Sequence, residues 1–289
     1  MKLKYSKVSV NTFDKPKKIK RVEGEKNEKN PMSYLLYFLL VVGISIFLAL
    51  ALRFIFIYQE SRYNTSAFSV LVEAKNPFIV SYDKNLNRLT FLKLKSVEKN
   101  KIKESILLGV PIDGRVKAEN LSPEKFSSIG TIVNQLFAPW NYTYYDMTIF
   151  DSIKLSSLAL PIPYKDISFL TLSVNTEGER EGATNEQVYN AFKDSDLLDE
   201  QHSIEIINGT DVTGLAGMVG EVLKSAGANV VSIRSTDSVE NSTVIASQNS
   251  KTMKRIVHLL GIPAGIDESF VGVSDIKIVL GTDFGNKLK

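Results

Sequence analysis

The chain has 289 residues, of which 44% are hydrophobic, and a formal net charge of +3. This length allows one large or two modest folded domains, and so small a net charge does not indicate a nucleic-acid partner. The absence of cysteine excludes disulfide bonds, thiol catalysis and cysteine-bound metal.

The charge is unevenly distributed along the chain. Residues 1–31 contain ten Lys and Arg residues against four Asp and Glu residues, a net charge of +6, so the remaining residues carry −3. Because this segment has few apolar residues and a high charge, we expect it to be disordered.

A long apolar segment follows the basic tail. Met32–Leu52 is a run of 21 residues without a charged side chain, and a helix of about 20 residues spans a bilayer core. Tyr34 and Tyr37 at one end and Phe54 and Tyr58 at the other suit the two aromatic belts of a membrane span. The excess of basic residues before the span predicts a cytoplasmic N-terminus and an extracytoplasmic remainder.

A buried core helix and a cleavable signal peptide are the alternatives to a membrane anchor. Ala49-Leu50-Ala51 has the small-x-small form of a cleavage site. However, the apolar region of a signal peptide has about 7–15 residues, and this one is longer and continues through Ile57. We therefore predict an uncleaved anchor over residues 32–58 that contacts the lipid bilayer.

Residues 66–173 are rich in short apolar runs of β type. Turn-forming residues at 83–88 separate two of these runs, and an apolar pattern with helical spacing follows Ser122-Pro123. The expected strands are 67–73, 78–82, 88–94 and 105–108, the expected helix is 126–137, and the apolar segments 144–150 and 167–172 could complete a sheet.

Residues 174–201 form a polar joint that contains a short helix. Thr184 and Gln187 have the spacing of a capping box, in which each side chain satisfies a free amide at the start of a helix. The charged run 194–200 is expected to be a solvated surface.

The last part of the chain, residues 202–289, alternates strand and helix patterns. Asn208-Gly209 is turn chemistry after the first strand, and Thr210 is expected to cap the helix behind it. Close spacing of Gly214, Gly217 and Gly220 suggests a close approach of this helix to the sheet. The expected order is β-α-β-β-α-β, a ferredoxin-like arrangement, with strands 203–207, 229–233, 243–247 and 275–280 and a second helix over 251–260.

Several short motifs in this region together resemble one family. The motifs are Asn208-Gly209-Thr210, Val212, Gly214-Leu215-Ala216, Ala226-Gly227 and the closing Leu280-Gly281-x-Asp283-Phe284. Between Ile204 and Phe284 the chain resembles the LytR C-terminal domain family of the bacterial cell envelope. The resemblance implies an envelope location and an accessory role. Asp211 departs from it, since family members often carry glycine there.

The middle region has a weaker likeness to the catalytic domain of the LytR–CpsA–Psr family. The likeness implies a transferase that moves wall glycopolymers from a polyprenyl-pyrophosphate carrier. Such a transferase uses Asp and Arg side chains and Mg²⁺ to hold the pyrophosphate. Residues 74–83 lack the clustered Asp and Arg of that pattern, and Asp113-Gly114-Arg115 is typical of a solvated turn. We therefore interpret residues 66–173 as a degenerate or unrelated domain. A divergent transferase using Asp83, Asp113 and Arg115 is the alternative.

Other catalytic patterns are missing from the sequence. The chain has only two histidines, His202 and His258, and lacks a dinucleotide fingerprint, a P-loop and a nucleophile elbow. No metal, cofactor or nucleic acid is expected.

The sequence therefore predicts an α+β protein of the cell envelope without catalytic activity. Its parts are a basic tail (1–31), an anchor (32–58), a mixed domain (66–173), a linker (174–201) and a LytR C-terminal-like domain (202–289). The terminal domain is expected to bind a wall polymer or another envelope protein; a scaffold of the wall-synthesis or division machinery is a further alternative. The candidate binding residues, which ordinary turn chemistry also explains, are Asn208, Thr210, Asp211 and Thr213.

Overall fold

The computed structural model describes residues 31–59, 67–95, 100–118, 143–148, 150–152, 155, 167–174, 180–270 and 272–288. Two compact units are distinguished, residues 1–52 and residues 53–289. The predicted helix over 126–137 lies outside the described residues. The predicted tail over residues 1–31 also lies outside them, except for its last residue.

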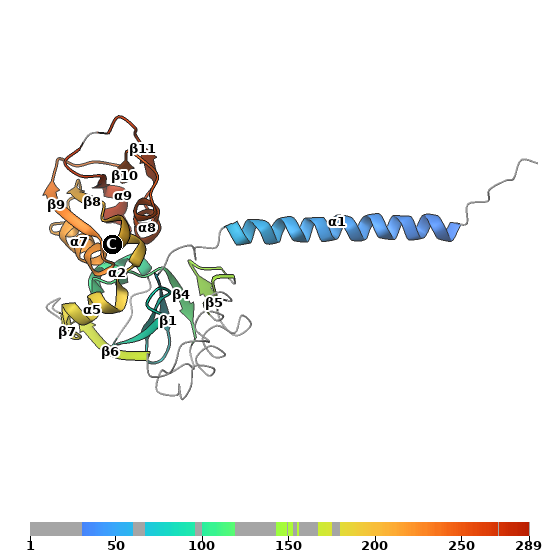
Figure 1. Ribbon diagram of the computed structural model, residues 1–289, viewed down its shortest axis with the longest axis horizontal. Coiled ribbons are helices and arrows are strands. Elements are labelled where there is room, and N and C mark those ends of the chain that lie inside the picture. The colour runs from blue at the N-terminus through green and yellow to red at the C-terminus, as the bar shows by residue number, and fades with distance from the viewer. Residues whose placement is uncertain are drawn as a thin grey trace, which may run out of the picture. The chain divides into compact units, whose positions relative to one another are not determined.

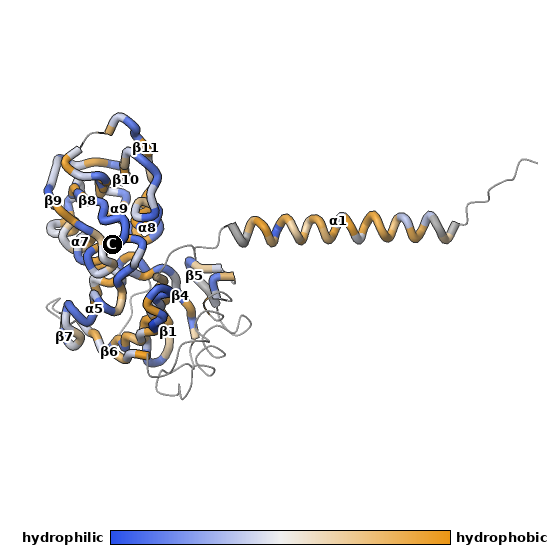
Figure 2. Tube along the Cα trace, viewed as in Figure 1, coloured by the Kyte–Doolittle hydropathy of each residue, from blue (hydrophilic) through white to orange (hydrophobic). Residues whose placement is uncertain are grey.

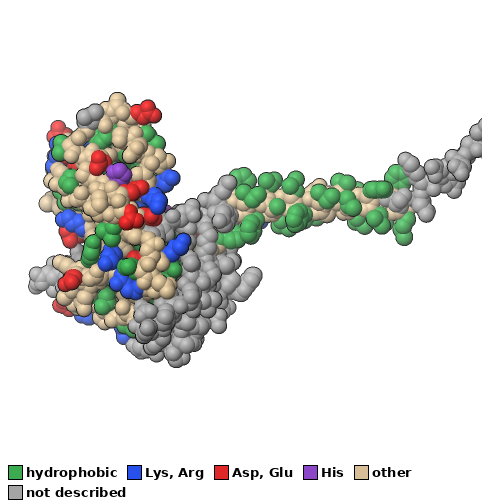
Figure 3. Space-filling view, viewed as in Figure 1, with side chains coloured by type: hydrophobic (Ala, Val, Ile, Leu, Met, Phe, Trp, Pro, Cys, Tyr) green, Lys and Arg blue, Asp and Glu red, His purple; other side chains and the backbone are tan. Residues whose placement is uncertain are grey.

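Helix α1 (Pro31–Gln59) carries the long apolar segment. Within it, Tyr34–Phe56 is long and apolar enough to cross a membrane. Large hydrophobic side chains are exposed along its length from Met32 to Phe56, and they give α1 its apolar colour in Figure 2 and its apolar surface in Figure 3. An exposed helix without a polar face is suited to hydrocarbon rather than to water.

A seven-stranded sheet is formed by the middle of the chain (Figure 1), in the order β5-β4-β1-β2-β3-β6-β7. Strands β1, β2 and β3 form an antiparallel meander, β4 is parallel to β1, and β6 is parallel to β3. Its strands are β1 (Ala67–Glu73), β2 (Phe78–Asp83), β3 (Arg88–Leu94), β4 (Gly114–Lys117), β5 (Thr143–Tyr145), β6 (Ile167–Val174) and β7 (Arg180–Gly182).

The central strands of this sheet are buried on both faces. Alternate residues of a strand point to opposite faces, so Phe68 and Phe91 join one apolar cluster while Leu71 and Leu92 join another. The second cluster also receives side chains from α2 (Lys101–Leu108) and α5 (Asn185–Phe192). The three strands predicted over 67–94 and the strand predicted over 167–172 are confirmed as β1, β2, β3 and β6.

The strand predicted over 105–108 is wrong, because these residues belong to helix α2. The Asn100 side chain accepts hydrogen bonds from the backbone N–H groups of Ile102 and Lys103, which satisfies the start of a helix. Ile102 and Ile106 then lie one turn apart, and Gly109 ends the helix with φ +60°. A four-residue apolar run by itself does not distinguish a strand from a helix.

Two other expectations are corrected in part. Of the apolar segment 144–150, only the beginning is a strand, since β5 ends at Tyr145 and residues 150–152 are helical. The charged run 194–200 contains α6 (Ser195–Glu200), and its N-cap Asp194 is fully buried rather than solvated. The capping box of Thr184 and Gln187 at the start of α5 is confirmed.

A five-stranded sheet is formed by the C-terminal part of the chain, in the order β11-β10-β12-β8-β9. The predicted β-α-β-β-α-β element order and the α+β class are confirmed, with the short β11 added after the second helix. The elements are β8 (Ser203–Asn208), α7 (Leu215–Ser225), β9 (Asn229–Ser235), β10 (Thr243–Ala246), α8 (Lys251–Leu260), β11 (Ala264–Ile266), β12 (Ile276–Leu280) and α9 (Thr282–Asn286).

The pairing of these strands differs from the ferredoxin-like arrangement. In that split βαβ arrangement another strand lies between the two strands that flank the first helix. Here β8 and β9 are direct parallel neighbours, and β12 pairs in parallel with the other side of β8. The order of the elements along the chain is the same in the two arrangements. That order therefore does not determine the order of the strands in the sheet.

The predicted close approach of the first helix to the sheet occurs at one of the three glycines. A Cβ atom at Gly220 would lie 2.9 Å from Cδ1 of Ile233 on β9, whereas one at Gly217 would meet nothing within 4 Å. Gly214 lies before the helix as its N-cap, with φ +79°. Thr210 therefore does not cap α7.

Candidate functional site

The predicted binding residues lie in the turn after β8. The side chain of Asn208 is buried, and its Oδ1 accepts hydrogen bonds from the backbone N–H and the hydroxyl of Thr210, at 3.1 and 2.7 Å. Its amide donates to the Val212 carbonyl at 2.9 Å, and Thr210 Oγ1 accepts from the Val212 N–H at 3.1 Å. Asn208 and Thr210 thus hold the turn together, while the side chains of Asp211 and Thr213 are exposed to solvent.

This turn lies beside the closing motif of the chain. The Gly209 N–H donates to the Leu280 carbonyl at 2.9 Å, and a Cβ atom at Gly285 would lie 3.6 Å from the side chain of Thr210. A Cβ atom at Gly281 would lie 2.7 Å from the backbone of Asn241, so no larger residue fits there. The two parts of the sequence signature are therefore adjacent in the fold, and hydrogen bonds join them.

Asp283 and Phe284 stabilise the end of the domain that contains the turn after β8. Oδ1 of Asp283 accepts hydrogen bonds from the N–H and hydroxyl of Ser242, at 2.9 and 2.5 Å. Phe284 is fully buried in the cluster that β8, β12, α7 and α8 share. Within this chain, Asp283 and Phe284 close the end of the domain around its core.

The three residues of the alternative transferase site do not come together. Asp83 lies opposite Ala67 at one end of β1, and its Oδ1 accepts from the backbone N–H groups of Asn85 and Leu86 in the following turn. Asp113 is completely buried. Arg115 pairs with Leu71 farther along β1, and its guanidinium contacts other carboxylates.

Asp113 belongs to a buried ion-pair network that joins the two sheets. The guanidinium of Arg255 on α8 contacts both carboxylate oxygens of Asp113, and its Nε lies 2.9 Å from Oδ2 of Asp194. Side-chain exposure is 1% for Arg255 and 0% for both aspartates. His258 Nε2 lies 3.4 Å from Asp113 Oδ1, and the Ser69 N–H donates to Asp113 Oδ2 at 2.8 Å.

The charges in this network control its titration. Burial by itself would raise the pKa of Asp113, but the charges of Arg255 and His258 and the hydrogen bonds outweigh it and lower that pKa. Burial would likewise lower the pKa of Arg255, and the two aspartates raise it instead. Both groups therefore keep their charges, and the network links α8 to the strand-rich part of the chain.

Arg255 is not marked by any local sequence motif, because its partner Asp113 is 142 positions away. One local signal was present. Arg255 lies on the buried side of α8 with Thr252, Ile256 and Leu259, so an arginine occupies the stripe of core positions. A buried arginine is expected to be paired.

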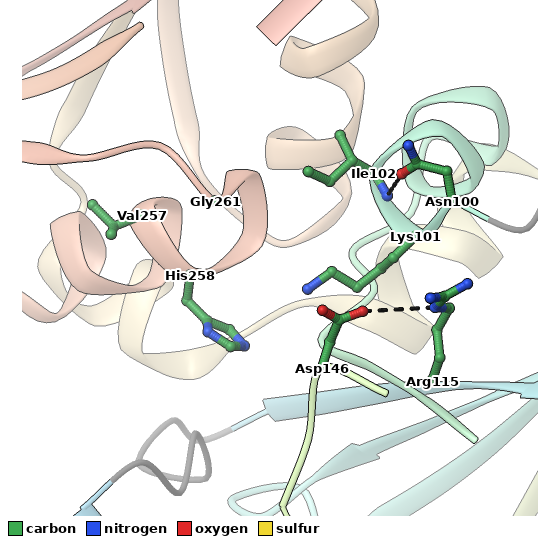
Figure 4. Close-up of a pocket in the computed structure, with 8 residues that line it drawn as sticks. All are labelled: Asn100, Lys101, Ile102, Arg115, Asp146, Val257, His258 and Gly261. Atoms are coloured by element: carbon green, nitrogen blue, oxygen red, sulfur yellow. Dashed lines mark hydrogen bonds and ion pairs between the residues drawn. The ribbon is translucent and has the colours of Figure 1, made fainter. Parts of the chain in front are cut away.

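A pocket of about 620 Å³ lies beside this network (Figure 4). It is formed between the start of α2, the strands β4 and β5, and the end of α8. Cationic side chains and one carboxylate face it together with apolar residues. The lining residues are Asn100, Lys101, Ile102, Arg115, Asp146, Val257, His258 and Gly261.

Acidification should destabilise the folded chain. Four carboxyl groups have a lowered pKa: Asp113, Glu200, Asp275 and Asp283. Burial by itself would raise each pKa, but hydrogen bonds and neighbouring positive charge outweigh burial. A carboxyl group whose pKa is lower in the folded state stabilises that state at any pH above its pKa in the unfolded state. This stabilisation is lost as the pH falls through the pKa of the folded state. We expect the free energy of unfolding to decline as the pH falls below the ordinary values of 4.5 for Glu and 3.8 for Asp.

Urea unfolding followed by circular dichroism at a series of pH values tests this expectation. Asp283→Asn should make the decline shallower, whereas Asp237→Asn at an exposed position should leave the slope unchanged. Equal slopes for the wild type and Asp283→Asn would contradict the assignment to Asp283.

Comparison with known proteins identifies the terminal part of the chain. Residues 201–284 match the family model described as "LytR cell envelope-related transcriptional attenuator". This match covers less than a third of the chain. No sequence among the curated proteins matches the chain.

The solved structures that match the chain include proteins of Bacillus and Listeria. The transcriptional regulator yvhJ of Bacillus subtilis is 9% identical, with a TM-score of 0.31 over 57% of this chain and 100% of its own. B. subtilis TagV is 10% identical, with a TM-score of 0.28 over 57% and 99%. The putative transcriptional factor Lmo1026 of Listeria monocytogenes is 11% identical, with a TM-score of 0.27 over 37% and 80%.

None of these structures reaches 25% identity or a TM-score of 0.5, so no function follows from them. The family model covers the same residues as the turn and closing motifs described above. The resemblance found in the sequence is thereby confirmed: residues 201–284 form a domain of the LytR C-terminal family.

Proposed function

We propose that this chain is a single-pass protein of the cell membrane whose terminal domain binds a wall polymer or another envelope protein without catalysing a reaction. The observation that carries the proposal is the family match of residues 201–284, which describes envelope-related proteins. Helix α1 supports the anchoring, because Tyr34–Phe56 is long and apolar enough to cross a bilayer. In this arrangement the basic tail is cytoplasmic and the two sheets are extracytoplasmic.

The non-catalytic part of the proposal is supported by how the charged side chains are used. Transfer from a pyrophosphate carrier needs carboxylates and cations that face the reacting group. Asp113 is instead buried against Arg255, and Asp83 is engaged in its own turn. Asp83 and Asp113 therefore have structural roles in two separate places.

The binding part of the proposal rests on the turn after β8. Asn208 and Thr210 fix its backbone through their hydrogen bonds, so Asp211 and Thr213 are presented to solvent on a rigid support. Rigid presentation favours binding, because little conformational entropy is lost when a ligand is bound.

Sedimentation of the full chain with isolated cell walls in a non-ionic detergent tests the proposal. The double variant Asp211→Asn, Thr213→Val should weaken wall binding by about tenfold if these residues contact the polymer. A matched double variant at exposed positions elsewhere, Asp199→Asn, Ser247→Ala, should bind as the wild type does.

Two results would contradict parts of the proposal. Failure of the wild-type chain to sediment with walls would exclude polymer binding and favour a protein partner, which capture by cross-linking in membranes would reveal. Transfer of polymer from a polyprenyl-pyrophosphate carrier by the purified chain would exclude the non-catalytic assignment.

A further inference from the structure

We propose that the pocket between α2, β4 and α8 binds an oxyanion, a phosphate or carboxylate group, and that Asp146 is the counter-ion which the ligand displaces. This site is distinct from the turn after β8. Its occupation does not depend on wall binding, since a free anion in solution is sufficient to test it.

Arg115 is the central cation of the pocket (Figure 4). Its guanidinium donates to Glu73 Oε1 at 3.1 Å on one side and lies over the ring of Tyr145 at 5.1 Å. On the other side Nε lies 3.6 Å from Asp146 Oδ2, the ion pair drawn in the figure. The side chain of Arg115 is only 17% exposed, so these contacts fix the guanidinium at the pocket wall.

Lys101 brings further positive charge to the same space. Nζ of Lys101 donates to the main-chain oxygen of Asp113 at 3.2 Å, and this bond holds a buried ammonium group at the pocket. His258 reaches the pocket from α8. The carboxylate of Asp113 behind Lys101 is paired with Arg255, a guanidinium that Asp194 also contacts.

Asp146 is the weakest partner in this arrangement. Its side chain is 38% exposed and its contact with Arg115 is longer than the contact that Glu73 makes. Exposed ion pairs of this kind contribute about 0–1 kcal/mol. An oxyanion that forms two short hydrogen bonds with a guanidinium binds more strongly, because the geometries of the two groups match. Displacement of Asp146 by such a ligand is therefore favourable.

The start of α2 assists without donating directly. Asn100 already accepts the N–H groups of Ile102 and Lys103, so these amides are not offered to a ligand. The partial positive charge at the beginning of the helix still favours an anion in the pocket. Recognition therefore depends on the side chains of Arg115 and Lys101.

Isothermal titration of the full chain in a neutral detergent with inorganic phosphate tests the proposal. Arg115→Gln should weaken phosphate binding by about tenfold or more, since a bidentate charged contact is lost. Asp146→Asn should strengthen it by a few-fold, because the competing negative charge is removed. Asn also suits this position, where φ is +58°.

The opposite directions of the two variants separate a ligand site from a structural role. Lys95→Gln removes a cation whose side chain is 70% exposed and pairs with Glu181 outside the pocket, so it should leave binding unchanged. An unchanged or weaker affinity of Asp146→Asn would overturn the proposal. So would binding by Arg115→Gln, folded by circular dichroism, that equals binding by the wild type.

Two sources of the ligand share this chemistry, a phosphodiester polymer and a lipid headgroup. Glycerol 3-phosphate in solution and nanodiscs of phosphatidylglycerol, each compared with phosphate-free controls, distinguish them. A response to either ligand that Arg115→Gln abolishes supports the site and names its source. The absence of binding to phosphate, glycerol phosphate and anionic nanodiscs would overturn the proposal, whatever the wall-sedimentation result.

Discussion

Arg255→Met should lower the free energy of unfolding by about 3–5 kcal/mol, the cost of leaving a buried charge unpaired. The substitution removes the guanidinium but leaves the carboxylates of Asp113 and Asp194, both with 0% side-chain exposure. Because these residues come from separate segments, the loss should loosen α8 from the strand-rich part of the chain. Urea unfolding of the purified chain measures the change.

Lys254→Met provides the matched control, because it makes a similar change one position earlier on the exposed side of α8. Its effect should stay within about 0.5 kcal/mol, as for most surface substitutions. Equal stabilities of Arg255→Met and Lys254→Met would show that the network contributes no stability. A separate early unfolding transition of the C-terminal residues would show that the network holds the two sheets together.

Phe284→Ala should also destabilise the chain by about 3–5 kcal/mol, the usual cost of removing a buried aromatic side chain. Phe284 is completely buried at the end of the terminal domain, in the cluster that includes Leu215, Ile278 and Leu280. The closing motif would then lose its apolar side chain and would keep hydrogen bonds such as those from Ser242 to Asp283.

Phe169→Ala is the control for this second prediction. Phe169 is 50% exposed and stacks on Phe91 with ring centroids 5.3 Å apart, so its truncation removes one aromatic pair rather than a core side chain. Its cost should be about 1 kcal/mol. Thermal unfolding by calorimetry compares the two variants, and a smaller loss for Phe284→Ala than for Phe169→Ala would contradict the role of Phe284.

Local patterns determined much of the secondary structure. The second helix of the terminal domain was predicted over 251–260 and is α8 over the same residues, because Ser250 caps its start and Gly261, with φ +61°, ends it. The capping box of Thr184 and Gln187 is likewise set by residues three positions apart. Such features need no distant contact, so they follow from the sequence.

Local patterns failed where apolar runs were short or charges were buried. Residues 105–108 were predicted to form a strand, although Asn100 starts a helix that includes them. The run 194–200 was predicted to be solvated, although Asp194 is buried by its contact with Arg255. In both cases the deciding group lies outside the window that suggested the prediction.

The candidate sites show the same division. The turn residues Asn208 and Thr210 were identified from their sequence, but only their hydrogen bonds distinguish them from the exposed Asp211 and Thr213. Their role in binding stays a prediction. The pocket was not predicted, since Lys101, Arg115 and His258 come from three separate segments.

The sequence by itself determined an apolar segment of membrane-spanning length, an α+β chain and a terminal domain of the LytR C-terminal family. These depend on composition, on periodicity and on short motifs, which are properties of neighbouring residues. Only the tertiary structure decided that β8 lies between β9 and β12, that Asp113 pairs with Arg255, and that Arg115 faces a pocket. Those outcomes depend on which distant segments pack together and exclude water. A charge that is buried in this way is costly unless it is paired, so Asp113 and Arg255 are stable there only together.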